Sequence, residues 1–272
     1  MTFLLILLLI PPLLLKSDPI YLCSSAPIAS VISEITGSTG RVKFITSASF
    51  SPNSYEITTD DILLSHSSLI FFYSSDSTSP WIFDLPARNK INLSDLIPSE
   101  DILLDSDSNV IPYFWMNPVL TSKIAKKIAD SLSFYDSENS EKYKNNVASF
   151  ANRLSLLDRM IESKLTNKKR IPLWGDVNTL AYFSAEYGFS GGQFLSNSFS
   201  SIPENDSRLS KFKPNSGDIF YYNIQLGKSS ADFFARHHRV KNFGINVWGD
   251  SLNTRYYDII TSNLNKIVLA LP

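Results

Sequence analysis

The sequence has only one cysteine, Cys23, and three histidines among its 272 residues. A single cysteine excludes an internal disulfide and any metal cluster held by several thiolates. Basic residues are not in excess either, because the formal net charge is −1. A nucleic-acid-binding surface normally needs a basic stripe or patch. The composition therefore argues against a disulfide-stapled fold and against a nucleic-acid partner.

The motifs of several common enzyme classes are also missing. The chain has no glycine-rich phosphate-binding loop and no HExxH zinc motif. The pair Gly191-Gly192 is a turn signal. We therefore do not expect an enzyme.

Long apolar runs are absent except at the amino terminus, where residues 1–15 read MTFLLILLLIPPLLL and Lys16 follows. Spanning a bilayer takes about 20 apolar residues, so this run better matches the apolar part of a secretion signal. No basic residue precedes it and no small-x-small cleavage motif follows it, which leaves an uncleaved anchor as the alternative. Leu22 is bulky for the position before a lipidated Cys23. We expect residues 1–16 to direct export, either to the periplasm or to the extracytoplasmic side of a membrane.

Short apolar runs rich in β-forming residues recur through the rest of the chain. They lie at residues 20–23, 42–46, 69–73, 171–174, 219–222 and 243–247. Runs without strict alternation are typical of strands buried on both faces of a parallel sheet, and helical patterns separate most of them. The runs form two series, one before about residue 117 and one after about residue 170. This pattern predicts an α/β protein with two lobes and mainly parallel sheets.

A long helical pattern separates the two series. Asn117 and Pro118 form an N-cap and first-turn pair that opens one helix. After a break near residues 136–140, a second helix carries an apolar stripe in steps of three and four: Tyr143, Val147, Phe150, Leu154, Leu157, Ile161 and Leu165. Because no complementary charges flank the stripe, a packed bridging helix is favoured over a coiled coil. The expected limits are a signal segment at 1–16, an N-terminal lobe at 17–136, the bridging helix at 137–167 and a C-terminal lobe at 168–272.

Two motifs in the first half of the chain match known receptor patterns. Residues 51–56, SPNSYE, are similar to the pattern Asp-Pro-His-x-Tyr/Phe-Glu at three positions, Pro52, Tyr55 and Glu56. Residues 112–118, PYFWMNP, resemble the pattern Pro-His-x-Trp-x-Asp-Pro at Pro112, Trp115 and Pro118. Both patterns carry a metal-binding histidine in the receptors that contain them.

Two further motifs follow the bridging helix in the matching order. Tyr182, Tyr187 and Gly188 are similar to the helix after the third metal ligand, and residues 246–249 stand where the pattern has Asp-Pro-Leu-Gly. With the bridging helix between them, the four motifs resemble the zinc- and manganese-binding receptors of ABC transporters. The resemblance implies a rigid two-lobed receptor that holds a transition metal in its cleft and delivers it to a membrane permease.

The residues at the metal-ligand positions differ from those of that family, which typically uses three histidines and a carboxylate. The matching positions here are Asn53, Tyr113, Val177 and Asn246. Val177 has no side-chain donor, and each of the two amides offers only a neutral carbonyl oxygen. The phenol of Tyr113, with a reference pKa of about 10, ionises at a cost near neutral pH. The alignment therefore predicts a degenerate metal site, with no metal assigned to it.

Carboxylates beside these positions are the remaining candidates for a metal site: Glu56, Asp176 and Asp250. Zinc or manganese would bind only if such shifted carboxylates rebuilt the site. His66 is expected to lie away from the cleft. His237 and His238 point about 100° apart on a helix, so they do not readily chelate one ion together.

The predicted function is an extracytoplasmic solute-binding protein of an ABC transporter, with a membrane permease as partner and a small solute or metal ion as cargo. Asn53, Tyr113 and Asn246, with Trp115 as a structural neighbour, would line the cleft with aromatic and neutral polar groups, which suit a small uncharged organic solute. The alternative is an interaction protein with the receptor fold that binds a protein partner and no solute. A cleft filled by side chains favours the alternative, and an open cleft favours a ligand.

Overall fold

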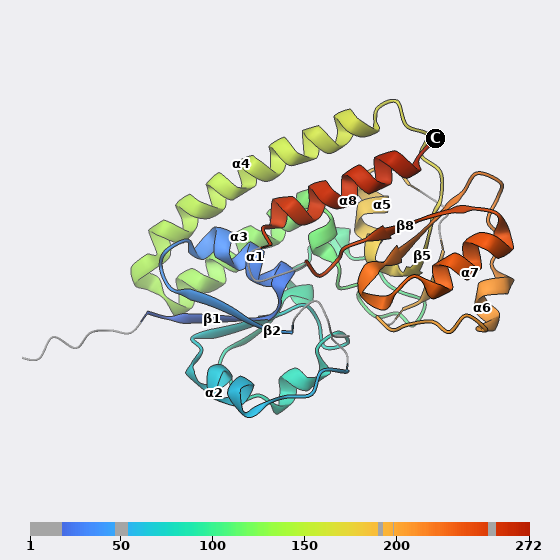
Figure 1. Ribbon diagram of the computed structural model, residues 1–272. Helices are drawn as coiled ribbons and strands as arrows, with labels where there is room; N and C mark the ends of the chain where they lie inside the picture. The colour runs from blue at the N-terminus through green and yellow to red at the C-terminus, as the bar shows by residue number, and fades with distance from the viewer. Residues whose placement is uncertain (1–17, 47–53, 190–192, 198, 250–253) are drawn as a thin grey trace, which may run out of the picture.

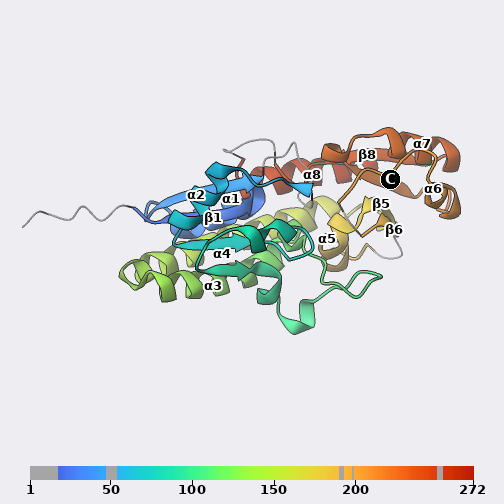
Figure 2. The ribbon, with the colours of Figure 1, turned by 90° about the horizontal axis from the view of Figure 1, so that it is seen from below.

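The computed structural model describes residues 18–46, 54–189, 193–197, 199–249 and 254–272. Two four-stranded parallel sheets form two lobes, and the 26-residue helix α4 (Ser140–Leu165) runs along both (Figure 1). Seen from below, the lobes lie end to end in an elongated molecule (Figure 2). The predicted α/β class with two lobes and parallel sheets is confirmed.

The first lobe is built around β1 (Ile20–Ser25), whose strand neighbours are β2 (Arg41–Thr46) and β3 (Ile70–Tyr73). The short strand β4 (Lys90–Asn92) completes the order β2-β1-β3-β4, and every pairing is parallel. Its helices are α1 (Ala26–Thr36), α2 (Thr59–Ser67) and α3 (Pro118–Tyr135). Parallel strands place their carboxyl ends at one edge of the sheet, so this lobe has a single edge at which loops gather.

The second lobe repeats this arrangement. β5 (Leu173–Val177), β6 (Phe194–Ser196), β7 (Ile219–Asn223) and β8 (Lys241–Ile245) lie in the order β6-β5-β7-β8, again all parallel. Its helices are α5 (Ala181–Glu186), α6 (Ser207–Lys211), α7 (Ser229–His238) and α8 (Tyr256–Ala270). Single 3-10 turns occur at Pro80–Asp84, Leu93–Leu96, Ser99–Asp101, Phe114–Met116, Ser137–Asn139, Asn178–Leu180 and Ile224–Leu226.

Helices α3 and α4 form as their sequence signals predict. The Asn117 side chain caps α3 by accepting hydrogen bonds from the amides of Val119 and Leu120, at 2.8 and 3.1 Å. All seven residues of the predicted α4 stripe are buried. At 1.5 Å per residue, α4 is about 39 Å long. Asp158 accepts a hydrogen bond from the Tyr187 hydroxyl at 3.1 Å, which ties α4 to the end of α5.

Two strands are shifted from their predicted positions. The predicted run at 171–174 overlaps β5 only at residues 173 and 174, because β5 begins at Leu173. The strand then continues through Gly175 and Asp176, two residue types that usually disfavour strands. A Cβ at position 175 would lie 2.3 Å from the Tyr221 ring, so glycine makes room for that ring. The run predicted at 243–247 is β8 at 241–245, a partly exposed edge strand that starts with two polar residues. β4 and β6, three residues each, were not predicted.

The carboxyl-terminal helix returns toward the first lobe. α8 contacts both α1 and α4, and it begins beside α1 in Figure 1. The two lobes are therefore connected by more than one helix. Among the described residues, no helix has the length and apolar character needed to cross a membrane.

Candidate interlobe site

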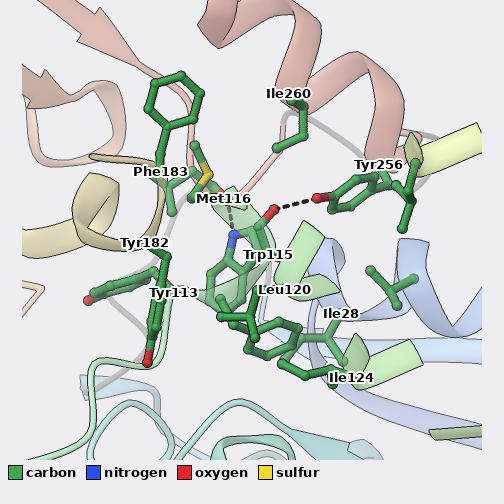
Figure 3. Packing of buried hydrophobic residues seen from close by; sticks show 14 of the residues in the cluster. Ile28, Tyr113, Trp115, Met116, Leu120, Ile124, Tyr182, Phe183, Tyr256 and Ile260 are labelled. Atoms are coloured by element: carbon green, nitrogen blue, oxygen red, sulfur yellow. Dashed lines mark hydrogen bonds between the residues drawn. The ribbon is translucent and has the colours of Figure 1, made fainter. Parts of the chain in front are cut away.

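Residues 113–116 connect the two lobes. Trp115 is fully buried, and its indole N–H donates to the Val247 carbonyl at 3.1 Å, just after β8. Its own carbonyl accepts a hydrogen bond from the Tyr256 hydroxyl of α8 at 2.8 Å (Figure 3). Trp115 is thus held at both its side chain and its backbone.

Trp115 belongs to a group of four aromatic side chains in ring contact. We call them the interlobe aromatic cluster: Tyr113, Trp115, Phe199 and Trp248, each at most 3% exposed. Their contacting pairs have centroids 5.3 to 6.5 Å apart, mostly tilted or edge-to-face, as aromatic pairs prefer. Burial, and secondarily the charge of Asp176, raises the pKa of Tyr113 above its usual value. The phenolate that a metal ion would need is thus less accessible than in water.

Asp176 and Val177 end the central strand of the second sheet. The Asp176 carboxylate accepts hydrogen bonds from the Val177 amide at 2.7 Å, from the Asn223 amide at 2.9 Å and from the Asn223 side chain. Burial nevertheless raises the pKa of Asp176 to about 6. Val177 is fully buried, and its carbonyl accepts from the Tyr221 hydroxyl at 2.7 Å. Protein donors therefore already surround the carboxylate beside the third ligand position.

Asn246 follows β8 and is fixed by two side chains. Its backbone N–H donates to the Asn263 side-chain oxygen at 2.8 Å, and its carbonyl accepts from the Asn263 side-chain nitrogen at 2.6 Å. Its side-chain oxygen accepts from the Gln225 amide. Asn246 is thereby held at the carboxyl edge of the sheet by α8 and by the segment after β7.

The other predicted residues are placed less centrally. Glu56 is exposed, two residues before the Thr58 N-cap of α2. His66 is exposed on α2, and His237 and His238 lie at the end of α7, near the amino end of β8 and opposite its carboxyl edge. Asn53 and Asp250 lie outside the described residues.

Metal-ligand chemistry is sparse in the part of the chain that the structure describes. No three His, Cys, Asp or Glu side chains come together there as a metal-binding group. The sequence reasoning missed several side chains at this edge: Asn178, Phe199, Asn223, Gln225 and Trp248. Each follows or ends a strand of the second sheet, and that position is the signal by which they could have been found.

Two lobes with parallel four-stranded sheets, joined by a long helix, are the architecture of a two-lobed solute-binding protein. The chain belongs to the family described as the periplasmic component A of the zinc-uptake complex (ZnuA), whose model matches residues 22–270. The resemblance expected from the sequence motifs is therefore confirmed.

Curated relatives are distant and longer. The zinc-binding lipoprotein AdcA of Streptococcus pneumoniae is 22% identical over 179 residues, which cover 60% of this chain and 36% of the relative. The zinc-binding protein AdcA of Streptococcus pyogenes is 20% identical over 190 residues, 60% of this chain and 37% of the relative. This chain thus aligns with little more than a third of the curated relatives it matches.

Solved structures share the fold over nearly the whole chain. The periplasmic zinc-binding protein TroA of Treponema pallidum gives a TM-score of 0.79 at 16% identity, covering 93% of this chain and 99% of TroA. The laminin-binding adhesin Lmb of Streptococcus agalactiae gives 0.77 at 17% identity, covering 93% and 99%. At these identities the likeness is evidence for the fold alone.

Proposed function

We propose that the chain is the extracytoplasmic solute-binding subunit of an ABC transporter, that it passes its cargo to a membrane permease, and that its metal site has been lost. Residues 1–16 would direct export, to the periplasm or to a membrane anchor. The lobes would span 17–136 and 168–272, with 137–167 as the bridge. Membership of a binding-protein family supports a role without catalysis.

The observation that carries the loss of metal is the side chain at the third ligand position. Val177 is fully buried and offers no lone pair to an ion. A tight zinc site needs three or four protein ligands. At the other described positions, Tyr113 has a raised pKa, and the Asn246 oxygen already accepts from Gln225.

A shifted carboxylate site has little support among the described candidates. Asp176 accepts three protein hydrogen bonds, and Glu56 is exposed ahead of α2. A metal ion at Asp176 would have to displace the Asn223 and Val177 donors. Zinc or manganese would therefore be cargo only with ligands from elsewhere in the chain, such as Asp250.

Metal analysis tests this proposal. The chain from residue 17 is purified, its metal content is measured, and ZnCl2 and MnCl2 are titrated by calorimetry at pH 7. We expect no stoichiometric metal and no saturable heat at micromolar ion concentrations. Binding of one equivalent at micromolar affinity would contradict the proposed loss, and Asp250→Asn and Glu56→Gln would then identify which carboxylate holds the ion.

A second candidate is an interaction protein that binds a protein partner and no solute. The observation that favours it is the burial of the aromatic cluster, whose rings fill space between the lobes. The name of the structural neighbour Lmb refers to laminin binding, so the same fold occurs in a protein named for a macromolecular partner. On this alternative, no small solute raises the melting temperature of the chain.

A further inference from the structure

The last strand of the second sheet has a free edge. β8 lies at the end of the order β6-β5-β7-β8, so β7 is its only strand neighbour among the described residues. An edge strand presents a row of main-chain N–H and C=O groups that no other strand pairs. In the part of the chain that the structure describes, no backbone hydrogen bond other than those to β7 reaches residues 241–245. Four of the five residues of β8 are exposed or half-buried, so its outer edge is open to a further strand.

A groove of about 610 Å³ follows this edge, and we call it the β8 groove. It is lined by residues 240–243, by Asp232, Ala235 and Arg236 of α7, and by Lys266, Leu269 and Ala270 of α8. Figure 1 shows β8 between these two helices. Since α7, β8 and α8 all line the groove, it runs along the strand edge with a helix on each side. A strand-sized segment is the shape that such a groove accommodates.

The charged side chains of the β8 groove are mostly basic. Arg236, Lys241 and Lys266 line it, and none of the three forms an ion pair or a side-chain hydrogen bond within the described residues. The acidic residue of the groove, Asp232, already has an ion pair with Lys228, at 3.6 Å. The groove thus presents three cations without partners and one acid that has a partner. This charge favours a negatively charged occupant.

Leu269 and Phe243 give the β8 groove an apolar part. Leu269, in the last turn of α8, is 83% exposed. Phe243 is half-buried in β8, and its ring centroid lies 6.3 Å from that of Tyr221. Side chains alternate between the two faces of a strand. A strand in which apolar and acidic residues alternate would therefore place one kind of side chain near these apolar groups and the other near the cations.

Charge disfavours a second copy of this chain as the added strand. Two β8 grooves facing each other would bring the same three cations close to one another, and like charges on paired strands are destabilising. The other long edge strand, β2, carries Arg41 and Lys43, so it would also oppose like charges. The edge strands β4 and β6 have only three residues each. The complementary strand therefore belongs to a different protein.

We propose that the β8 groove binds an extended acidic segment of a partner protein, which adds a strand to the second sheet. Main-chain hydrogen bonds to the free edge of β8 hold the segment, and Arg236, Lys241 and Lys266 select its carboxylates. A lipid surface offers negative charge but no main-chain groups for the strand edge. The groove lies at the amino end of β8, opposite the carboxyl edge that carries Asn246, so the inference is independent of the interlobe site and its cargo.

Peptide binding to the chain from residue 17, which contains all the described residues, tests the proposal by fluorescence anisotropy. The probe is a labelled peptide in which glutamate and valine alternate. One comparison peptide has lysine in place of glutamate, and the other keeps the glutamates but is N-methylated at every amide. We expect the first peptide to bind with a dissociation constant of about 100 μM or tighter, because only it has both the negative charge and the main-chain donors. The proposal is overturned if this peptide does not bind, or if either comparison peptide binds as tightly.

Charge reversal in the groove is compared with the same reversal elsewhere in the lobe. Arg236→Glu combined with Lys241→Glu should weaken binding of the acidic peptide by about tenfold or more. Lys211→Glu combined with Lys213→Glu is the control, because both residues lie outside the groove and the net charge changes equally; affinity should change less than about twofold. All four residues are exposed, so neither variant should unfold the chain. Equal weakening in the two variants would contradict the assignment, since the charge of the whole lobe would then attract the peptide.

Two further measurements distinguish the other occupants of the β8 groove. Cosedimentation with phosphatidylglycerol vesicles, lost in the groove variant and found without binding of the acidic peptide, would make the groove a membrane-binding surface. A dimer in analytical ultracentrifugation that Lys241→Glu strengthens or weakens would make it a contact between two copies of the chain. Either result overturns the proposal. A monomer that binds the acidic peptide and not the vesicles is the expected outcome.

Discussion

Strands β1 and β5 occupy the same place in their two sheets but end in different chemistry. Each lies second in its sheet order, and the register with the third strand pairs Cys23 with Phe72 in one lobe and Gly175 with Tyr221 in the other. The next two residues are Ser24-Ser25 in β1 and Asp176-Val177 in β5. All of them are at most 3% exposed.

The two strand ends differ in how their polar groups are satisfied. Three protein donors point at the Asp176 carboxylate, whereas the hydroxyls of Ser24 and Ser25 have no hydrogen-bond partner. The shared topology thus fixes where a strand ends and how deeply it is buried, but not which polar groups it presents. The second lobe satisfies the end of its central strand internally, and the first lobe leaves that end unsatisfied.

The lobes also differ in charge. Residues 17–136 contain 14 acidic and seven basic residues, and residues 168–272 contain eight acidic and 12 basic residues, so the lobes carry −7 and +4. The overall charge of −1 conceals this separation. Opposite charges at the two ends of an elongated molecule orient it in any charged field, including that of a partner surface.

The largest expected effect tests the packing of β5 against β7. In Gly175→Ala the new Cβ would lie 2.3 Å from the Tyr221 ring, which is fully buried and hydrogen-bonded to Val177. Overpacking usually costs about 1–3 kcal/mol, and we expect more than about 3 kcal/mol here because the ring cannot move aside. Urea unfolding measures the change in the free energy of unfolding.

The equivalent residue of β1 is the comparison for this prediction. Cys23→Ala removes one buried atom and should cost less than Gly175→Ala. The double variant Gly175→Ala with Tyr221→Leu should recover part of the loss, because the clashing ring is gone. A cost for Gly175→Ala no larger than that of Cys23→Ala would show that the β5–β7 contact is compliant.

Local signals explain which elements could be predicted from the sequence. The Asn117 cap and the α4 stripe are encoded within a few residues of one another, and both were predicted where they occur. The position of β5 was shifted because Gly175 is explained only by the Tyr221 ring, 46 residues away in sequence. A residue whose role depends on a distant contact gives no local pattern.

The residues of the candidate site also divide into those that could be predicted from the sequence and those that could not. Tyr113, Val177 and Asn246 could be selected from short motifs. Phe199 lies in none of these motifs, and Trp248 lies within the motif at 246–249 without being selected. The importance of both residues comes from ring contacts between segments far apart in the sequence. Whether a polar atom at a strand end has a hydrogen-bond partner is likewise a property of the folded arrangement, even where its position after a strand can be predicted.

The next largest effect concerns the pH dependence of stability. Burial raises the pKa of Asp176 from its usual range to about 6, so the folded chain holds a proton that the unfolded chain releases near pH 4. The favourable contribution is therefore present below about pH 4 and lost as pH rises through about 6. From the shift, this loss amounts to about 2–3 kcal/mol. No such change is expected from Ser24, its counterpart in β1.

Urea unfolding of the chain and of Asp176→Asn at pH 4, 5, 6 and 7 measures this contribution. The difference between the two proteins should move in favour of the variant as pH rises. Asp206→Asn is the control, because Arg208 lowers the pKa of Asp206 to about 2. The change in the free energy of unfolding that this substitution causes should therefore vary little between pH 4 and 7. If the difference in the free energy of unfolding between the chain and Asp176→Asn is also independent of pH from 4 to 7, the Asp176 carboxyl titrates in its ordinary range.

The smallest effect distinguishes a paired from an unpaired hydroxyl at the edge of the first sheet. Thr46 ends β2 and donates to the Ser24 carbonyl at 2.7 Å, whereas the Ser24 hydroxyl has no partner. Thr46→Val should therefore lower the free energy of unfolding by about 1 kcal/mol, and Ser24→Ala should raise it by a similar amount. Opposite signs for two neighbouring buried hydroxyls are expected because only one of them has a hydrogen-bond partner within the protein. If both substitutions destabilise the chain, the Ser24 hydroxyl is satisfied in solution, and the contrast between the two strand ends is contradicted.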